Sequence, residues 1–463
     1  MEKLRSTEAE EENAAHIDAM RAAEHRMLEE AREYEDCECK DGMFPDLGRR
    51  RVLLAAGTGV AAAAAGLLPT GGRAHEAPMT GDWTQAPEDP TRVMGRPIGV
   101  NDGYGLRSPF ETETRGIPAG VNGNLAAWSM SPIGQSHGIV TPSGLHFERY
   151  RNGIPTIDPA RHTLTIHGMV DRPRRYTMSD LKRFPSASKL HFVECNGNTS
   201  SEWRVPTMKT VQFTHGLLST SEWTGVPFSV IAAEVGIKPD AAWVLAEGSD
   251  AAVMARSVPL DKMLEDAILV YGQNGEAIRP EQGYPLRLLL PGWEGNINIK
   301  WLRRLEISDR PFMTREETAS NADPMPDGKT RRFTFAMDAK SVITFPSGEM
   351  RLPGAGFYEV TGLAWSGRGK ITRVEVSRDA GRSWQAATLQ EPVLPKCTSR
   401  FRFPWFWDGS PAVLQSRCID ETGYVQPSLA DLTAIRGIVS HYHNNAIQSW
   451  AIASDGSVSN VHA

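Results

Sequence analysis

The chain has 463 residues, of which 40% are hydrophobic and 23% are charged, and it contains five cysteines. This composition excludes a disordered chain and a small disulfide-stabilised protein, and the length predicts two or three domains. The net charge is −6, but residues 1–48 hold six basic and fifteen acidic side chains. The rest of the chain is therefore nearly neutral and lacks the clustered Lys and Arg that nucleic acids require as a partner.

The N-terminal segment is typical of an exported protein. After the acidic leader, residues 1–48, the arginines Arg49, Arg50 and Arg51 precede an Ala- and Gly-rich run that has no charge before Arg73. Paired arginines before a weakly apolar run resemble the twin-arginine signal, which carries folded proteins out of the bacterial cytoplasm. An Ala-rich buried helix is the alternative, although the run lacks amphipathic spacing. We expect a signal over 49–74 with cleavage near Ala74, a linker over 75–94, a periplasmic protein and no stable membrane span after cleavage.

The cysteines give few constraints by themselves. Cys37 and Cys39 lie in the leader without further ligands at metal-binding spacing, which favours two incidental thiols. Cys397 and Cys418 could pair in an oxidising compartment, and the sequence alone does not establish whether they do. Cys195 is then left single.

The region 95–328 predicts an α+β domain. After a lead-in rich in Gly, Pro and Asn, short apolar runs predict strands at 163–166, 190–193, 243–246, 268–271 and 286–290 and helices at 179–183 and 228–235. No dinucleotide fingerprint and no Walker loop is present in the sequence, so NAD and ATP chemistry are unsupported.

The region 329–463 predicts a second domain. Runs of β-forming residues at 371–376, 383–388, 400–407 and 413–419 alternate with turn signals. Such spacing fits a β-sandwich.

Cys195 is the candidate for chemistry. It lies in the run HFVECNGN, where a strand-like segment enters a Gly/Asn turn, and sites are often built at strand ends. A thiolate there could bind a soft metal or attack an electrophile, and one Cys cannot decide between them. A buried structural thiol is the alternative.

Four runs, HFERYRNGIP (146–155), ECNGN (194–198), SEWTGVP (221–227) and GYPLRLLLPGW (283–293), resemble the sulfite oxidase family of molybdopterin enzymes in sequence, order and spacing. The longer runs ERYRNGIPTIDP, LRLLLPGWEGNINIKWLRRLEIS and MPDGKTRRFTFAMDAKSVI are most similar to the molybdenum subunit of its sulfane dehydrogenase branch. The resemblance spans about residues 96–462. It implies a sulfite-oxidase-type molybdopterin domain followed by an immunoglobulin-like β-sandwich dimerisation domain.

The resemblance also implies molybdenum and molybdopterin as cofactors. Cys195 would be the protein ligand of the metal and would act in catalysis together with Arg151. Gln282 stands where many members have His, which is tolerated if the side chain donates one hydrogen bond. The cofactor-binding residues implied are Arg149, Tyr150, Arg151, Asn152, Cys195, Asp250, Gln282, Arg287, Asn298, Ile299 and Lys300.

Two positions depart from the family pattern. Sulfite oxidases follow the ligand Cys with A-G-N-R-R, whereas this chain has NGNTS at 196–200. A pocket without those arginines binds a free sulfite dianion less well. A tyrosine expected before Pro324 is Asn321 here, and no substitute is evident because Tyr284 and Tyr358 lie in other segments.

The implied activity is oxidation of sulfane sulfur held on a carrier protein, with oxygen from water, in thiosulfate and sulfur oxidation. The sequence has no C-x-x-C-H for a haem of its own, so a c-type cytochrome subunit would take the electrons, in a heterotetramer built on a homodimer of this chain. The alternatives are a sulfite dehydrogenase and a non-catalytic assembly member. His441 and His443 favour packing or an inter-subunit hydrogen bond over a metal site.

Overall fold

The structure is a computed structural model that describes residues 103–438 and 441–463. Arg115–Ala463 belong to one compact unit. Residues 103–114 belong to another and contain turns without helix or strand. The predicted leader, signal and linker, with Cys37 and Cys39, lie outside the described residues.

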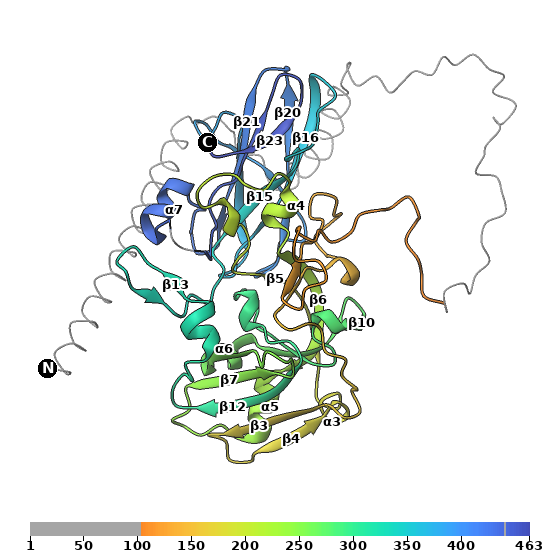
Figure 1. Cartoon of the computed structure of the whole chain (residues 1–463), viewed down its shortest axis with the longest axis vertical. Helices are drawn as coiled ribbons and strands as arrows, with labels where there is room; N and C mark the ends of the chain where they lie inside the picture. Colours follow the sequence, from red (N-terminus) through yellow and green to blue (C-terminus); the bar gives the residue numbers. More distant parts are fainter. Residues whose placement is uncertain (1–102, 439–440) are drawn as a thin grey trace, which may run out of the picture. The chain divides into compact units, whose positions relative to one another are not determined.

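The first domain is built on two five-stranded sheets (Figure 1). In one, the strand order is β10-β9-β6-β5, and β11 also pairs with β9. Its strands are β5 (Ala187–Glu194), β6 (Leu218–Pro227), β9 (Ile268–Gln273), β10 (Glu276–Ala277) and β11 (Arg287–Leu289). The other has the order β4-β3-β12-β7-β8, in which only the β12–β3 pair is parallel. Its strands are β3 (Thr163–Gly168), β4 (Arg174–Thr177), β7 (Trp243–Gly248), β8 (Ala255–Pro259) and β12 (Leu302–Ser308).

Local sequence explains where the helices of this domain begin and end. The predicted helix at 228–235 is confirmed as α5 (Phe228–Val235). Phe228, Ile231, Ala232 and Val235 are buried at helical spacing, and Gly236, at φ +70°, ends the helix. The helix predicted at 179–183 is α3 (Met178–Leu181), and two others, α4 (Val211–His215) and α6 (Leu260–Asp266), complete the domain. Its main core joins apolar side chains of both sheets with α5 and α6.

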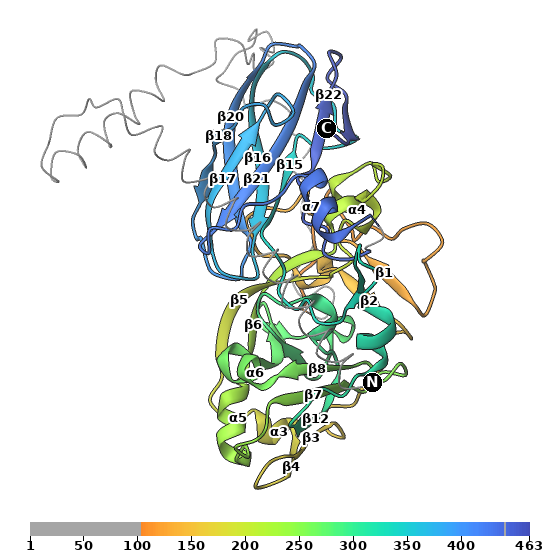
Figure 2. The ribbon, with the colours of Figure 1, turned by 90° about the vertical axis from the view of Figure 1, so that its left-hand side faces the viewer.

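The second domain is an immunoglobulin-like β-sandwich, drawn in blue in Figure 2. One sheet has the order β15-β16-β20-β19, with strands β15 (Lys340–Phe345), β16 (Gly356–Trp365), β19 (Thr388–Gln390) and β20 (Ser399–Trp407). The other has the order β18-β17-β21-β22-β23, with strands β17 (Ile371–Ser377), β18 (Gln385–Ala386), β21 (Ala412–Asp420), β22 (Ser449–Ile452) and β23 (Val458–Val461). The helix α7 (Leu429–Arg436) lies between β21 and β22 in the chain.

One strand of the sandwich differs from the prediction. The single strand expected at 383–388 is wrong, because the chain changes sheets within it: β18 pairs with β17, whereas β19 pairs with β20. The Ala387 N–H between them donates to the Val374 carbonyl at 2.8 Å. The adjacent Ala386 and Ala387 interrupt the alternation of apolar and polar residues at this crossing, which the prediction of one strand did not take into account.

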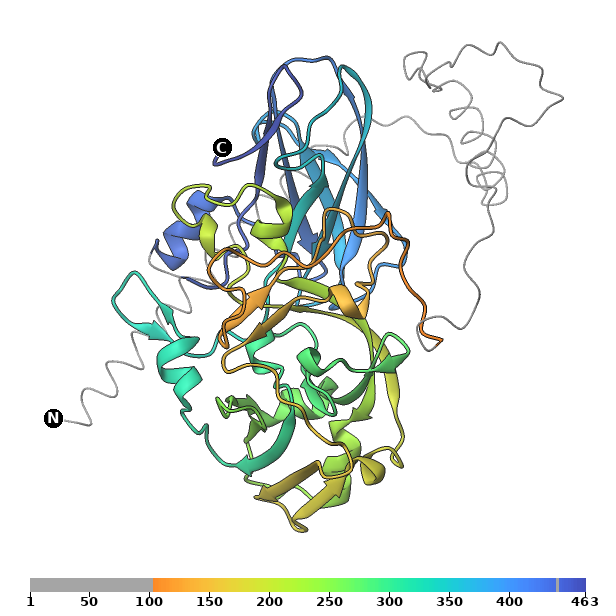
Figure 3. The same ribbon diagram turned by 45° about the vertical axis from the view of Figure 1, so that its right-hand side comes forward.

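The two domains share apolar packing. Phe192 of β5 and Leu218 of β6 belong to the hydrophobic core of the second domain, together with Trp365 and Trp450. Figure 3 shows these light-green strands reaching the blue sandwich.

Two further hairpins are β1 (Ala127–Ser129) with β2 (Glu148–Tyr150), and β13 (Asp323–Pro324) with β14 (Thr330–Arg331). The boundary predicted after residue 328 falls in the turn of the second hairpin. No helix of the described part of the chain is long and apolar enough to cross a bilayer.

Candidate active site

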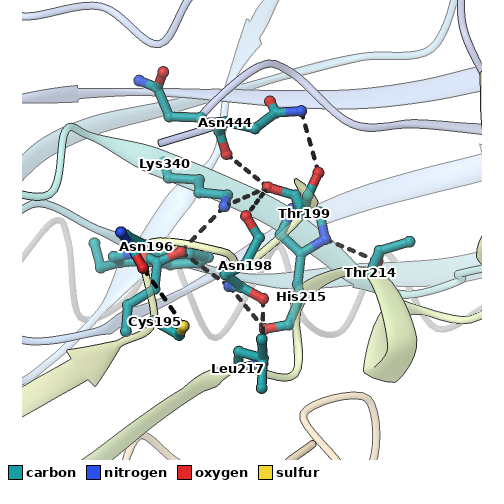
Figure 4. Close-up of polar contacts among 12 residues, drawn as sticks. Cys195, Asn196, Asn198, Thr199, Thr214, His215, Leu217, Lys340 and Asn444 are labelled. Carbon is teal, nitrogen blue, oxygen red and sulfur yellow. Dashed lines mark hydrogen bonds and ion pairs between the residues drawn. The ribbon is translucent and has the colours of Figure 1, made fainter. Parts of the chain in front are cut away.

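Cys195 follows directly on β5, where the strand predicted at 190–193 is confirmed. Its N–H donates to the Leu217 carbonyl at 3.0 Å, and its own carbonyl accepts from the Asn198 N–H at 2.9 Å, which closes a turn. The Asn198 amide group also donates to the His215 carbonyl at 3.1 Å. Thr199 then takes a left-handed backbone conformation with φ +65°, which costs a non-glycine residue free energy. The turn is therefore held in one conformation by contacts on both sides (Figure 4).

The second domain supplies part of that support. Lys340 of β15 lies 3.1 Å from the carboxylate of Glu194, and both side chains are almost fully buried. The Lys340 ammonium also donates to the Thr199 hydroxyl at 2.8 Å, and the Trp365 indole donates to Glu194 at 2.6 Å. The Thr199 hydroxyl in turn donates to the Asn444 carbonyl at 2.6 Å (Figure 4). The loop that carries Cys195 is thus fixed by a buried network that crosses between the domains.

A cavity of about 340 Å³ opens beside Cys195, a size within the usual range for small-molecule sites. Its walls come from β1 and β2, the loop after Cys195, the segment around Asp250, residues 282–301, and the later residues Asn321 and Tyr442. The predicted site residues that line it are Arg149, Tyr150, Arg151, Cys195, Asp250, Gln282, Arg287, Asn298, Ile299 and Lys300. Asn152 is exposed and is not among the lining residues, so its cofactor role stays a prediction.

Arg287 is a buried cation on the cavity wall. Its side chain donates to the carbonyls of Gln282 (3.0 Å) and Asn298 (3.4 Å) and lies over the Trp223 ring at 4.9 Å. It pairs with no carboxylate in the part of the chain that the structure describes, and burial lowers its pKa to about 9. A buried charge without a counter-ion is costly. The arrangement therefore indicates that an anion belongs beside it.

Lys300 adds a second cation. Its ammonium donates to the carbonyls of Arg149 and Glu281, each at 2.9 Å. Burial and the nearby Arg287 charge lower the pKa of Lys300 to about 7. An anion bound in the cavity would reverse this shift, because it stabilises the charged ammonium.

Two other predicted site residues, Gln282 and Asn298, shape the cavity wall because their side chains form hydrogen bonds with backbone groups. Gln282 donates to the Phe147 carbonyl at 2.8 Å. The Asn298 side chain accepts from the Leu290 N–H at 2.6 Å and donates to the Glu294 carbonyl at 2.9 Å. These two side chains therefore hold the segments that carry the cations.

Several polar atoms on the wall are buried and have no hydrogen-bond partner among the described residues. They are His146 Nε2, Asn196 Nδ2, Arg287 Nε, Asn296 Oδ1 and Asn321 Nδ2. Buried polar groups are normally paired, and unpaired ones need an explanation. Their gathering around one cavity indicates a polar ligand with both donors and acceptors.

The Cys195 thiol packs partly against a small apolar cluster that includes Val193 and Leu217. Burial raises its pKa, although the Gly197 N–H and the Arg149 charge act in the opposite direction. Burial without a metal therefore favours the neutral thiol, and a bound metal would favour the thiolate. This environment suits a metal ligand better than a free nucleophile.

The structure also reveals a tyrosine that sequence reasoning missed. Tyr442, which lies between α7 and β22, lines the cavity, and its hydroxyl donates to the Ser320 carbonyl at 2.5 Å, next to Asn321. Burial and the neighbouring Cys195 raise the pKa of Tyr442, whereas Arg151 and Arg149 lower it. These groups are therefore within electrostatic reach of one another. The run HYH offered a sign of Tyr442 only as the residue between two histidines.

Cys397, Cys418 and His443 do not line the cavity. Cys397 and Cys418 are both free and buried, and burial raises the pKa of each thiol. His443 is buried with Nε2 3.5 Å from Glu294 Oε2. The described residues contain no group of three or more His, Cys, Asp or Glu side chains that could hold a metal ion.

Comparison with known proteins shows which family this chain resembles. The family model for an oxidoreductase molybdopterin binding domain matches residues 151–316, and that for a Mo-co oxidoreductase dimerisation domain matches residues 331–450. The crystal structure of the sulfane dehydrogenase SoxCD from Paracoccus pantotrophus contains a similar chain, at 43% identity and a TM-score of 0.78. The match covers 81% of this chain and 96% of that one.

Curated relatives include the NADH nitrate reductase of Hordeum vulgare, 32% identical over 333 residues, and the mitochondrial sulfite oxidase of Drosophila melanogaster, 31% identical over 275 residues. The matches cover 63% and 55% of this chain and 36% and 48% of those proteins. The chain thus spans between a third and a half of the length of these relatives.

Fold and site together define a molybdopterin-dependent oxidoreductase. The chain belongs to the sulfite oxidase family.

The residues on the cavity wall fit the cofactor of that family. Arg287 and Lys300 can hold an anionic phosphate. The unpaired atoms of His146 and Asn296 can bond a polar heterocycle, and Cys195 can bind the metal. The fit rests on the buried, unpaired groups of this chain.

Proposed function

We propose that this protein oxidises sulfane sulfur carried on a cysteine of a partner protein. Each oxygen added to the sulfur would come from water, with formation of an S–O bond and release of two protons and two electrons. The bound cofactor supplies the two-electron redox change and the oxygen transfer. Arg287 and Lys300 hold its anionic part, and Cys195 binds its metal in a loop fixed by Lys340 and Glu194.

The single observation that carries the substrate proposal is the neutral character of the wall after Cys195. Asn196, Gly197, Asn198, Thr199 and Ser200 all line the cavity, and none is cationic. A free sulfite dianion loses much hydration on entry and needs charged donors in return. A sulfur chain on a carrier has a lower charge, and this wall suits it better.

Oxidation of free sulfite is the second candidate, and Arg151 favours it. This arginine lines the cavity, is only partly exposed, and has no hydrogen bond or ion pair with any residue that the structure describes. An unpaired guanidinium can bind an anion. Sulfite is the better substrate if Arg151 dominates substrate binding, and carrier-bound sulfur is the better substrate if the neutral loop at 196–200 does.

A direct comparison of two substrates tests the proposal. Molybdenum-loaded protein is given either a peptide bearing a cysteine persulfide or free sulfite, with oxidised cytochrome c as acceptor. Oxygenated peptide is measured by mass spectrometry and sulfate by ion chromatography. The Cys195→Ala variant reports the uncatalysed background. We expect faster product formation from the persulfide peptide. Turnover of sulfite alone would overturn the proposal in favour of a sulfite dehydrogenase.

We further propose that the protein is exported by the twin-arginine route, forms a homodimer through its sandwich domain, and passes electrons to a c-type cytochrome subunit in a heterotetramer. The match to a dimerisation domain and the likeness to a chain of the SoxCD structure support the assembly. Light scattering of the protein with and without a candidate cytochrome measures it. N-terminal sequencing of exported protein should begin near Ala74, and retention of residues 1–48 would contradict export with cleavage.

A further inference from the structure

Tyr442 lines the cavity that holds Cys195, although it belongs to the other domain. A β-carbon built on Gly197 would lie 3.7 Å from Cys195 Sγ and 3.9 Å from the Tyr442 ring. Sulfur and ring therefore both border the space above Gly197. A larger side chain or a substrate group in this space would contact both of them.

The position of Tyr442 is fixed on three sides. Its hydroxyl donates to the carbonyl of Ser320 at the end of the short π-helix Glu316–Ser320. The following residue, His443, has a left-handed backbone with φ +55°, and its N–H donates to the Asn196 carbonyl at 2.8 Å. The Asn444 amide donates to the Thr199 carbonyl at 3.2 Å. The segment is thus docked on the loop of Cys195, and the ring has little freedom to move aside.

Tyr442 has both charged and neutral side chains near it. Arg149 and Arg151 are within electrostatic reach of it. Asp323 is also within electrostatic reach, and Asn196 and Asn321, which line the cavity and adjoin the contacts of this segment, are neutral. A bulky neutral ring here therefore limits both the width of the pocket and the number of cations that can surround a substrate.

The geometry points to Tyr442 as a specificity-determining residue of the substrate pocket, contributed by the second domain. Its ring narrows the space beside Cys195 and keeps that side uncharged. The pocket then admits a thin sulfur chain on a tether in preference to the wider, pyramidal sulfite dianion. This inference rests on the proposed function, because it concerns the choice between those two substrates.

Substitutions at Tyr442 test the inference in the molybdenum-loaded protein. Tyr442→Ala widens the pocket and Tyr442→Arg adds a cation, so each should lower the ratio of kcat/KM for the persulfide peptide to kcat/KM for sulfite at least tenfold. A charge-assisted hydrogen bond is worth roughly 1.5–3 kcal/mol, or about ten- to a hundredfold. Tyr442→Phe keeps the ring against Gly197 and should change the ratio by less than about threefold.

Tyr358→Phe is the matched control, because the hydroxyl of Tyr358 also donates to a backbone carbonyl, that of Gly354 at 2.6 Å, and this tyrosine does not line the cavity. Molybdenum content is measured for every variant, so that a loss of cofactor is not counted as a change in specificity. If both Tyr442→Ala and Tyr442→Arg keep the ratio of wild type, the inference is wrong while the proposed function stands. If loaded wild type never oxidises the persulfide peptide, the proposed function itself fails.

Discussion

At the scale of single residues, substitution of Cys195 should affect activity strongly and stability only slightly. We expect Cys195→Ala to abolish turnover, because it removes the metal ligand, and to change the free energy of unfolding by only about 1 kcal/mol, because it removes one small side-chain atom from the cavity edge. Steady-state assays and urea unfolding measure the two effects.

Cys397 provides the control for that substitution. It is buried and free but lies outside the cavity, so Cys397→Ala should keep turnover even if it costs some stability. Near-normal activity of Cys195→Ala would show that the thiol is not a metal ligand.

Lys300 gives the cavity a pH dependence. Its pKa in the protein is lowered to about 7, and an anion bound nearby raises it, so cofactor binding takes up a proton when the pH exceeds about 7. Binding is therefore weakened as the pH rises from 7 to 9 and is insensitive to Lys300 below about pH 6. Molybdenum retained after dialysis of the loaded protein at each pH measures this effect.

Lys300→Arg is the matched variant, because a guanidinium stays charged throughout this range. It should retain molybdenum equally well from pH 6 to 9. A decline as steep as that of wild type would assign the pH dependence to another group.

At the scale of elements, the end of β5 depends on β15 across the domain boundary. Lys340→Met leaves the Glu194 carboxylate buried without its cation, which typically costs about 3–5 kcal/mol. The double variant Lys340→Met with Glu194→Gln removes both charges and should recover part of that loss. Urea unfolding of wild type, Lys340→Met, Glu194→Gln and the double variant measures the coupling.

Two results would contradict this view of the pair. One is a loss of less than about 1 kcal/mol in the free energy of unfolding for Lys340→Met, and the other is a double variant no more stable than the sum of the single changes predicts. Either would mean that the ammonium and carboxylate act independently.

The elements that sequence reasoning found are those with a local signal. The bounds of α5 follow from four buried residues at helical spacing between Pro227 and Gly236. The run at 286–290 contains β11, although only residues 287–289 pair, since pairing depends on the partner β9. The helix α6 was not predicted although Leu260, Met263 and Leu264 follow helical spacing, because seven residues are too short a run for that spacing to stand out.

At the scale of the whole molecule, the site is assembled from segments far apart in the chain. The cofactor residues predicted through the family resemblance come from separate segments of the first domain, at 149–152, 195, 250 and 282–300, and all except Asn152 line one cavity. Lys340 and Tyr442 could not be predicted in the same way. Their roles follow from how the sandwich packs against the loop after Cys195, and no local pattern in their own segments encodes that contact.

The most direct test of the account is the molybdenum content of the mature protein, measured by elemental analysis after purification from a host that makes the cofactor. The buried cations and unpaired polar atoms around Cys195 predict about one molybdenum per chain. Folded protein from such a host without molybdenum would contradict the account, because the cavity would then have another ligand and Cys195 another role.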